Sequence, residues 1–281
     1  MHPLILIILS CFFFSVLAVI VKLNSEFIHP IEQAFFRNIL SAIFFIPFLF
    51  LKKIKLNKKS NINLFILRGI FGGITMILLF WSYTLIPLSQ VMAISFSTPL
   101  FIYFGSIIFL GEKNIHKKTF VMFLGFVFTI IIIRPNLNVG LGTVLVTIAA
   151  LTHAIAGLLV KKLSHNENVL TLMFSMVVLM SPVTLIPSTY VWTTPNNFEI
   201  VFSLLFLAII ATLGNYCWTK AISLSNLTNL MPFDFFKLIF ATILGFIFFN
   251  EKIDIVTIIF GIGVIICNTY IAGKLKSSAE F

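Results

Sequence analysis

The stretch Leu230-Met231-Pro232-Phe233-Asp234-Phe235-Phe236-Lys237 opens an apolar run that continues to Phe249. A run of this length and composition predicts a membrane-spanning helix. Pro232 lacks a backbone N–H, so it starts or bends the helix at this point. Asp234 follows two residues later and is the only carboxylate well inside any apolar run of the chain. An ionisable group at membrane depth is costly unless it is paired or hydrated, so this stretch is the first candidate for function.

Lys237 lies three residues after Asp234, and side chains at that spacing are neighbours on one helix face. The two groups are therefore expected to neutralise each other. Two interpretations of the acid remain open. It can fasten a helix end near the membrane interface, or it can face a cavity inside the protein, as intramembrane charges generally do. We build the substrate site on the second interpretation.

The composition restricts the chain to integral membrane proteins. Of its 281 residues 59% are hydrophobic and 10% are charged, and the mean hydropathy is +1.11. Soluble domains contain about 25% charged residues. Helices are expected throughout, because barrel strands would alternate polar and apolar residues. The net charge of +10 does not indicate a nucleic-acid partner, since the basic residues stand in short loops that orient membrane spans.

The sequence contains no motif that is typical of an enzyme or of a metal site. The cysteines Cys11, Cys217 and Cys267 lie in apolar runs without metal-ligand spacing and are interpreted as small buried hydrophobes. No nucleophile elbow, metal-binding histidine motif or phosphate-binding loop is found, so we expect no enzyme, no cofactor and no metal site. The first run, Leu4 to Val21, lacks a basic start and a small-residue cleavage site, and it is interpreted as a span rather than a signal sequence.

Ten apolar runs are long enough to cross a bilayer. The predicted spans are roughly 4–21, 32–51, 65–86, 90–110, 118–135, 140–161, 168–187, 199–219, 227–249 and 254–273. With the amino terminus in the cytoplasm, the inner loops and flanks hold fourteen lysines and arginines and the outer ones hold three. Basic residues favour the cytoplasmic side, so both termini are expected inside the cell.

A constant offset of 139 residues relates the two halves. It places Val21-Lys22 on Val160-Lys161, Phe96 on Phe235, and Glu112-Lys113 on Glu251-Lys252. Five spans in each half is an odd number, so the second half inserts upside down. The sequence thus predicts an all-α membrane protein of ten helices, made of two inverted five-helix repeats at 1–136 and 137–281. Carriers of this plan bind substrate between the halves near mid-membrane.

Several short motifs stand in a fixed order along nearly the whole chain. They are Lys22, Arg37 after Pro30, Arg68, Trp81-Ser82-Tyr83, Gly111-Glu112-Lys113, Pro232-Phe233-Asp234 and Asn250-Glu251-Lys252. Their order and spacing resemble the EamA group of the drug/metabolite transporter superfamily. The resemblance implies a secondary carrier in a bacterial inner membrane, with a central cavity between the halves. Small multidrug exporters of the superfamily carry a glutamate in their first span, and Leu4 to Val21 has no acid, which disfavours a proton-driven cation exporter of that kind.

Arg37 in the second predicted span has two open interpretations. It can form a structural ion pair with Glu32, five residues earlier, although that spacing is imperfect on a helix. Alternatively, its guanidinium can contact a substrate carboxylate, which the planar fork of donors suits.

Aromatic pairs end two spans at comparable places in the two halves: Trp81 with Tyr83, and Tyr216 with Trp218. Aromatic residues at span ends usually form an interfacial belt. They can instead offer a stacking surface for a ring or a cation, with Asn215 adding hydrogen bonds.

Gln90, Ser95 and Thr98 open the fourth predicted span, which the offset matches to the ninth. They are expected to face Asp234 across the pseudo-symmetry axis, unless their side chains only bond their own helical turns. His153 stands among small residues and is either a packed, hydrogen-bonded histidine or part of a proton relay. Glu112 and Glu251 are interpreted as contacts at helix ends and at a gate, rather than as site residues.

The function predicted from these features is transport of a small polar metabolite by alternating access. Asp234 would offset a positive group, Arg37 or Lys237 would meet a carboxylate, and the aromatic residues would hold a ring. S-adenosylmethionine has all three groups, and within the EamA group the chain resembles carriers that take it up. An amino acid or another metabolite, moved in either direction, would satisfy the same residues. A receptor or assembly subunit that does not transport would keep the same spans.

Overall fold

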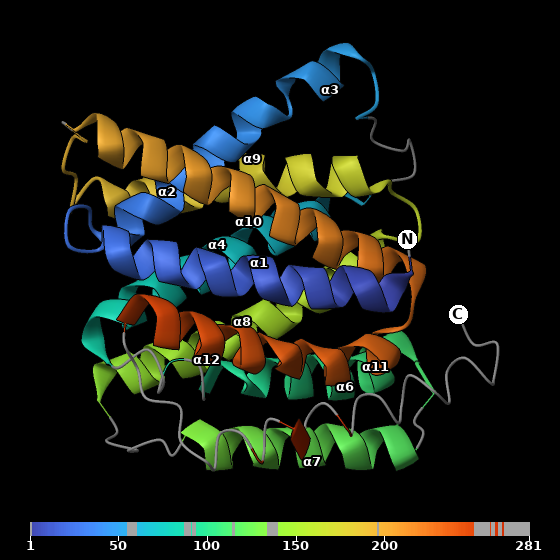
Figure 1. The fold of residues 1–281 in the computed structure, drawn as a ribbon. Coiled ribbons are helices and arrows are strands. Elements are labelled where there is room, and N and C mark those ends of the chain that lie inside the picture. The colour runs from blue at the N-terminus through green and yellow to red at the C-terminus, as the bar shows by residue number, and fades with distance from the viewer. Residues whose placement is uncertain are drawn as a thin grey trace.

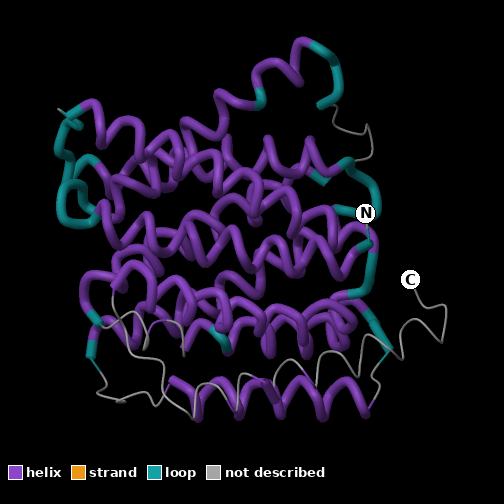
Figure 2. Tube along the Cα trace, in the orientation of Figure 1, coloured by secondary structure: helices purple, strands orange, loops and turns teal. Residues whose placement is uncertain are grey.

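The computed structural model describes residues 2–54, 61–86, 91, 94–113, 116–133, 140–195, 197–249, 259, 262, 263 and 266. All secondary structure in that part of the chain is helical (Figure 2). The elements are α1 Pro3–Asn24, α2 Pro30–Phe44, α3 Ile46–Phe50, α4 Ile62–Leu85, α6 Ser97–Leu110, α7 His116–Ile133, α8 Leu141–Leu163, α9 Val169–Ser188, α10 Phe198–Leu224, α11 Leu227–Leu230, the 3₁₀ helix η1 Met231–Phe235, and α12 Phe236–Phe249.

Among the described residues, seven helical stretches are long and apolar enough to cross a membrane: α1, α2 with α3, α4, α8, α9, α10, and α11 through α12. The shorter α6 is also apolar, and α7 is a helix of 18 residues. The first nine predicted spans therefore coincide with helix over most of their described residues. The tenth, 254–273, lies almost entirely outside the described residues.

The outside of the protein is apolar. Large hydrophobic side chains such as Phe50, Phe109, Phe198 and Phe202 are exposed, Phe198 to 86%. Exposed apolar area of this extent suits lipid rather than water. Together with the seven apolar helical stretches, it makes the chain a multi-pass membrane protein.

The helices lie side by side in a bundle, with α3 projecting from its edge and α7 along the opposite edge (Figure 1). α1 packs against α10 and α12, while α8 packs against α4 and α6. α4 also contacts α9, α10 contacts α2, and α2 contacts α9. Exchanging α1 with α8, α2 with α9, α4 with α10 and α6 with α12 turns each of these contacts into another member of the set or into itself. The packing is thus the same when the two halves of the chain trade places.

Glycines bring α4 and α9 close together. A Cβ atom added to Gly69 would lie 2.5 Å from Leu179 Cβ, and one added to Gly73 would lie 2.6 Å from a methyl group of Val183. Neither position has room for a side chain, so only glycine allows the two backbones to approach this closely.

Glu112 joins the end of α6 to the start of α11. Gly111 ends α6 in the left-handed conformation (φ 68°), which favours glycine. The Glu112 carboxylate then accepts hydrogen bonds from the backbone N–H groups of Leu227 and Thr228, at 2.9 and 2.8 Å. This acid is thus a contact at a helix end, as predicted from the sequence. Its predicted counterpart Glu251 lies outside the described residues.

Candidate functional site

The helix that carries Asp234 is broken into three parts. α11 ends at Leu230, η1 runs from Met231 to Phe235, and α12 begins at Phe236. Pro232 stands in the first turn of η1, where its missing N–H leaves no donor unused. The tighter 3₁₀ turn re-aims the chain between the two α-helical parts and holds Asp234 inside the protein, where it is 6% exposed.

Asp234 and Lys237 form the predicted ion pair. Lys237 Nζ donates to Asp234 Oδ2 at 2.9 Å. Residues of α1 hold the pair in place: the Cys11 thiol lies 3.7 Å from Asp234 Oδ1, and the Ser15 hydroxyl donates to the Lys237 carbonyl at 3.1 Å. The Lys237 ammonium lies 5.5 Å from the centre of the Phe14 ring, within the range of a cation–π contact.

This ion pair lines a cavity of about 210 Å³ between the two halves of the chain. The wall is mostly apolar, with a few polar groups, which is the usual character of small-molecule sites. Seven residues on one face of α4 line it, from Arg68 to Tyr83. Fifteen residues of helix correspond to about 22 Å, so the cavity is elongated along α4.

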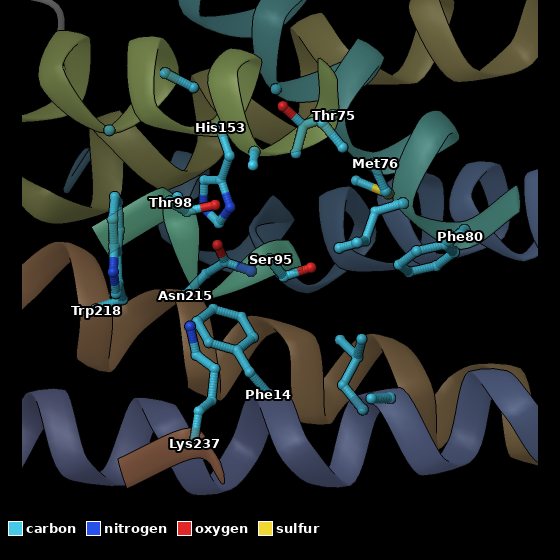
Figure 3. Close-up of a pocket in the computed structure, with 18 of the residues that line it drawn as sticks. Phe14, Thr75, Met76, Phe80, Ser95, Thr98, His153, Asn215, Trp218 and Lys237 are labelled. Atoms are coloured by element: carbon cyan, nitrogen blue, oxygen red, sulfur yellow. The ribbon is translucent and has the colours of Figure 1, made fainter. Parts of the chain in front are cut away.

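Nine of the twelve residues predicted to contact substrate line this cavity. They are Arg37, Tyr83, Ser95, Thr98, His153, Asn215, Trp218, Asp234 and Lys237. In Figure 3 the polar groups of Lys237, Asn215, Ser95, Thr98 and His153 come from different parts of the chain and gather in one region of the view, while Met76 and Phe80 lie in another. Ser95 and Thr98 thus line the same cavity as Asp234.

The aromatic pairs divide between the cavity and the outside. Tyr83 and Trp218 line the cavity, whereas Trp81 and Tyr216 are not among its lining residues, and Tyr216 is 41% exposed. Residues two apart on an α-helix point about 200° away from each other, so only one member of each pair can face inward. The sequence could not select that member. A substrate contact for Trp81 or Tyr216 stays a prediction without a place in this cavity, and Gln90 lies outside the described residues.

Arg37 does not pair with Glu32. The Glu32 carboxylate accepts from the backbone N–H and the hydroxyl of Thr193, both at 2.9 Å. The Arg37 guanidinium donates to Asn38 Oδ1 and lies against Met76 Sδ, each at 3.2 Å, and its buried Nε has no hydrogen-bond partner. The ion-pair interpretation of Arg37 was wrong, because Glu32 is held by a loop 161 residues further along the chain.

His153 and Trp218 form the ring-bearing side of the site. Their ring centroids lie 6.2 Å apart with the planes inclined by 43°. Asn215, one helical turn before Trp218, donates to the Ala211 carbonyl at 2.7 Å, which leaves its side-chain oxygen available to the cavity. A flat ring and a hydrogen-bonding amide thus lie on the same stretch of α10.

Two groups of lining residues were missed by the sequence analysis. Arg68 was interpreted as a basic residue at a span end and as part of the motif resemblance, without a role in the site, yet it is 3% exposed and lines the cavity. Thr75 also lines the cavity and shares a 2.7 Å hydrogen bond with the Thr152 hydroxyl, which joins α4 to α8. Arginine four residues inside a predicted span was a signal that could have identified Arg68.

The EamA-like transporter family matches the chain twice, over residues 1–134 and 140–272. The chain belongs to the EamA-like transporter family. Like the other members, it is therefore a transporter by family, and the resemblance noted in the motifs is confirmed.

The relatives of this EamA-like chain are named after different transported compounds. The S-adenosylmethionine uptake transporter of Rickettsia conorii is 29% identical over 84% of this chain and 80% of its own length. The pseudopaline exporter CntI of Pseudomonas aeruginosa is 21% identical over 93% of this chain and 92% of its own length. A solved crystal structure with 12% sequence identity superposes with a TM-score of 0.78 over 99% of both chains, which supports the fold.

Many of the residues that line the cavity of this EamA-like chain are related in pairs by the sequence offset of 139 residues. Sixteen of its 27 lining residues form eight pairs in which both members line the cavity. The pairs are Phe14 with His153, Leu17 with Ala156, Ala18 with Gly157, Arg37 with Met176, Met76 with Asn215, Leu79 with Trp218, Ser95 with Asp234, and Thr98 with Lys237. Phe96 and Phe235, also related by the offset, touch each other with ring centroids 5.9 Å apart. Contact between equivalent residues is what a two-fold relation between halves produces near its axis.

Proposed function

We propose that this chain is a secondary carrier that moves a small polar metabolite by alternating access, and that S-adenosylmethionine taken up across a bacterial inner membrane is its substrate. The observation that carries the proposal is the cavity between the halves, with the Asp234–Lys237 ion pair in its wall. A neutral pair of opposite charges suits a substrate that itself carries both signs. The names of the Rickettsia relatives support the choice of metabolite.

The chemistry of S-adenosylmethionine fits the wall group by group. Its positive sulfonium and ammonium groups complement Asp234, and its carboxylate complements Lys237 or Arg37. Its adenine ring suits the side of the cavity formed by His153 and Trp218, because aromatic side chains stack on any base. In this arrangement the zwitterionic head group separates Asp234 from Lys237 and gives each a new partner.

The proposed architecture is ten spans in two inverted repeats, residues 1–136 and 137–281, with both termini in the cytoplasm. Three observations support it: the two family matches, the helix contacts that are preserved when the halves are exchanged, and the eight cavity pairs at one offset. A reporter fused after residue 281 that is active only in the cytoplasm tests the orientation. Activity only on the outer side would reject it.

Uptake of radiolabelled S-adenosylmethionine into cells that express the chain tests the substrate. Unlabelled S-adenosylhomocysteine, amino acids and nucleosides serve as competitors, and cells with an empty vector provide the background. Saturable uptake that S-adenosylhomocysteine blocks supports the proposal for both substrate and direction. Background uptake, with the protein present in the membrane, rejects S-adenosylmethionine import.

The second candidate is export of an amino acid or another metabolite of the same class. The pseudopaline exporter among the relatives favours it, because it covers more of this chain than the uptake transporter of R. conorii does. A non-transporting receptor would bind substrate with the same cavity and move none. Loss of intracellular metabolites on expression would support the exporter, and binding without flux in either direction would support the receptor.

A further inference from the structure

Arg68 is a cavity residue whose charge the proposed function does not use. It lies six residues into α4, is 3% exposed, and lines the cavity at the end nearer the start of that helix. One guanidinium nitrogen donates to the Leu172 carbonyl of α9. A guanidinium has five N–H donors, so this single bond to a neutral carbonyl uses a small part of its capacity. The residue at the equivalent position of the other half is Leu207, which is fully buried and does not line the cavity.

The arginines of the cavity wall lack a carboxylate partner. Asp234 is paired with Lys237, Glu112 is held by α11, and Glu32 is held by Thr193. Among the described residues, neither Arg37 nor Arg68 has an acidic side chain within 4.0 Å. The lining therefore carries two positive charges beyond the neutral Asp234–Lys237 pair. Buried charges without partners are strongly unfavourable, which is the condition under which a ligand of opposite sign is attracted.

The two arginines occupy different levels of one wall. Arg37 contacts Met76, which lies eight residues beyond Arg68 on α4. Eight residues of helix correspond to about 12 Å, so Arg37 contacts α4 about two helical turns beyond the backbone of Arg68. Arg37 is fixed by Asn38, whose amide in turn donates to Thr184 of α9 at 3.2 Å. Both arginines are thus oriented by neutral groups and keep unused donors.

We propose that Arg68 is a second anion-binding point of the cavity, which acts with Arg37 to select metabolites that carry a carboxylate. The proposal rests on the proposed function and adds to it a residue and a restriction on the substrate class. A cationic compound that lacks the carboxylate meets two uncompensated arginines in the cavity and binds weakly. The same compound with a carboxylate binds well, because a guanidinium fork and a carboxylate form strong charge-assisted hydrogen bonds.

Competition between S-adenosylmethionine and its decarboxylated form tests the proposal, because the two differ only in the carboxylate. In cells with the wild-type chain, the decarboxylated competitor is expected to require about tenfold or more higher concentration to block uptake. Arg68→Gln is expected to reduce this ratio by about tenfold. Arg68→Lys keeps the charge and loses the fork, so it should reduce the ratio less. Lys162→Gln removes an exposed positive charge from α8 and serves as the matched control.

The outcomes separate a structural role of Arg68 from a role in selection. Arg68→Gln at normal membrane abundance with the wild-type ratio overturns the proposal, whatever its total uptake. Where Arg68→Gln fails to reach the membrane, Arg68→Lys decides alone, and an unchanged ratio in that variant overturns the proposal.

A binding measurement keeps the test independent of transport. The melting temperature of the purified protein in detergent is compared with millimolar methionine and with 3-methylthiopropylamine, which is methionine without its carboxylate. A ligand that binds the folded state raises the melting temperature. Methionine alone is expected to raise it, and the rise should be lost in Arg68→Gln and reduced in Arg68→Lys. Such a result in a chain that does not move S-adenosylmethionine would reject the proposed substrate and support the role of Arg68. Equal shifts by both compounds, in a chain that does move S-adenosylmethionine, would reject the role of Arg68 alone.

Discussion

The two halves of the chain build the same cavity wall with different chemistry. At five of the eight paired positions the second half places an acid, a base, an imidazole, an amide or an indole, and the first half places a hydroxyl or an apolar side chain. Asp234 is matched by Ser95 and Lys237 by Thr98, while His153 is matched by Phe14. The exception is Arg37, a charged residue of the first half whose equivalent in the second half is Met176. The shared backbone plan thus fixes where side chains point, and single substitutions decide which half carries the charge.

The comparison of the two halves also distinguishes the positions that shape the cavity from those that orient a substrate in it. Positions where both halves are apolar or small, such as Ala18 with Gly157, give the cavity its form in both halves. Positions where the halves differ give it direction, because a substrate placed between Asp234 and Arg37 cannot be rotated into an equivalent position. A carrier with two similar halves can therefore bind an asymmetric metabolite in one orientation.

The largest difference in uptake between equivalent positions of the two halves is expected when the carboxylate of Asp234 is removed. Asp234→Asn leaves the ammonium of Lys237, whose side chain is only 21% exposed, without its ion-pair partner in the cavity wall. We expect at least about a hundredfold loss of uptake at normal membrane abundance. The matched substitution Ser95→Ala, at the equivalent position, should reduce uptake by less than about threefold. Uptake near the wild-type level in Asp234→Asn would remove Asp234 from the site.

Transfer of the ion pair to the other half tests whether the equivalent positions of the two halves are interchangeable. The variant Ser95→Asp, Thr98→Lys, Asp234→Ser and Lys237→Thr moves both charges to their equivalent positions at the same spacing of three residues. We expect uptake about tenfold above that of Asp234→Ser with Lys237→Thr, because the pair still lines the cavity. The measurement is initial uptake rate at matched membrane abundance. A rate no higher than that of the charge-free variant would show that the two positions are not interchangeable.

Trp218 and Trp81 offer a comparison between an inward and an outward aromatic residue. Trp218→Ala is expected to raise the half-saturation concentration of an adenine-bearing substrate about tenfold, since base stacking contributes about 1–3 kcal/mol. Trp81→Ala should leave it within about twofold, because Trp81 is not part of the cavity wall. Both variants are measured in the same uptake assay. A larger effect at Trp81 than at Trp218 would return Trp81 to the substrate site.

The smallest expected effect concerns the helix-end contact of Glu112. Glu112→Gln keeps the shape of the side chain and weakens its two hydrogen bonds to the start of α11. A lost helix cap typically costs about 1 kcal/mol, which corresponds to a fall of a few degrees in the melting temperature. Glu26→Gln, a change at an exposed acid in the turn after α1, is the control. Equal melting temperatures for the wild type and Glu112→Gln would show that the contact does not stabilise the fold.

Local patterns predicted the elements and the central ion pair. Apolar runs predicted the helices, and the spacing of Asp234 and Lys237 predicted their contact, because both depend on residues close in sequence. Glu32 shows where such reasoning ends. Its partner Thr193 comes from a distant loop, and no local pattern relates the two. Arg68 shows a second limit, since an arginine near a span end can either extend to the interface or turn inward, and only the packing of α4 against α9 decides.

The length of the α4 face that lines the cavity bears on how far the helices must move to open the cavity to either side of the membrane. Its length of about 22 Å is a large part of a hydrocarbon core that is about 30 Å thick. With α4 along the membrane normal, about 8 Å of the hydrocarbon core would be left for the packed side chains that separate the cavity from the two aqueous phases. A barrier of one or two helical turns can be opened on one side and rebuilt on the other by small tilts of neighbouring helices. A membrane voltage would likewise fall mainly across this thin septum, where a displaced charge experiences most of the field.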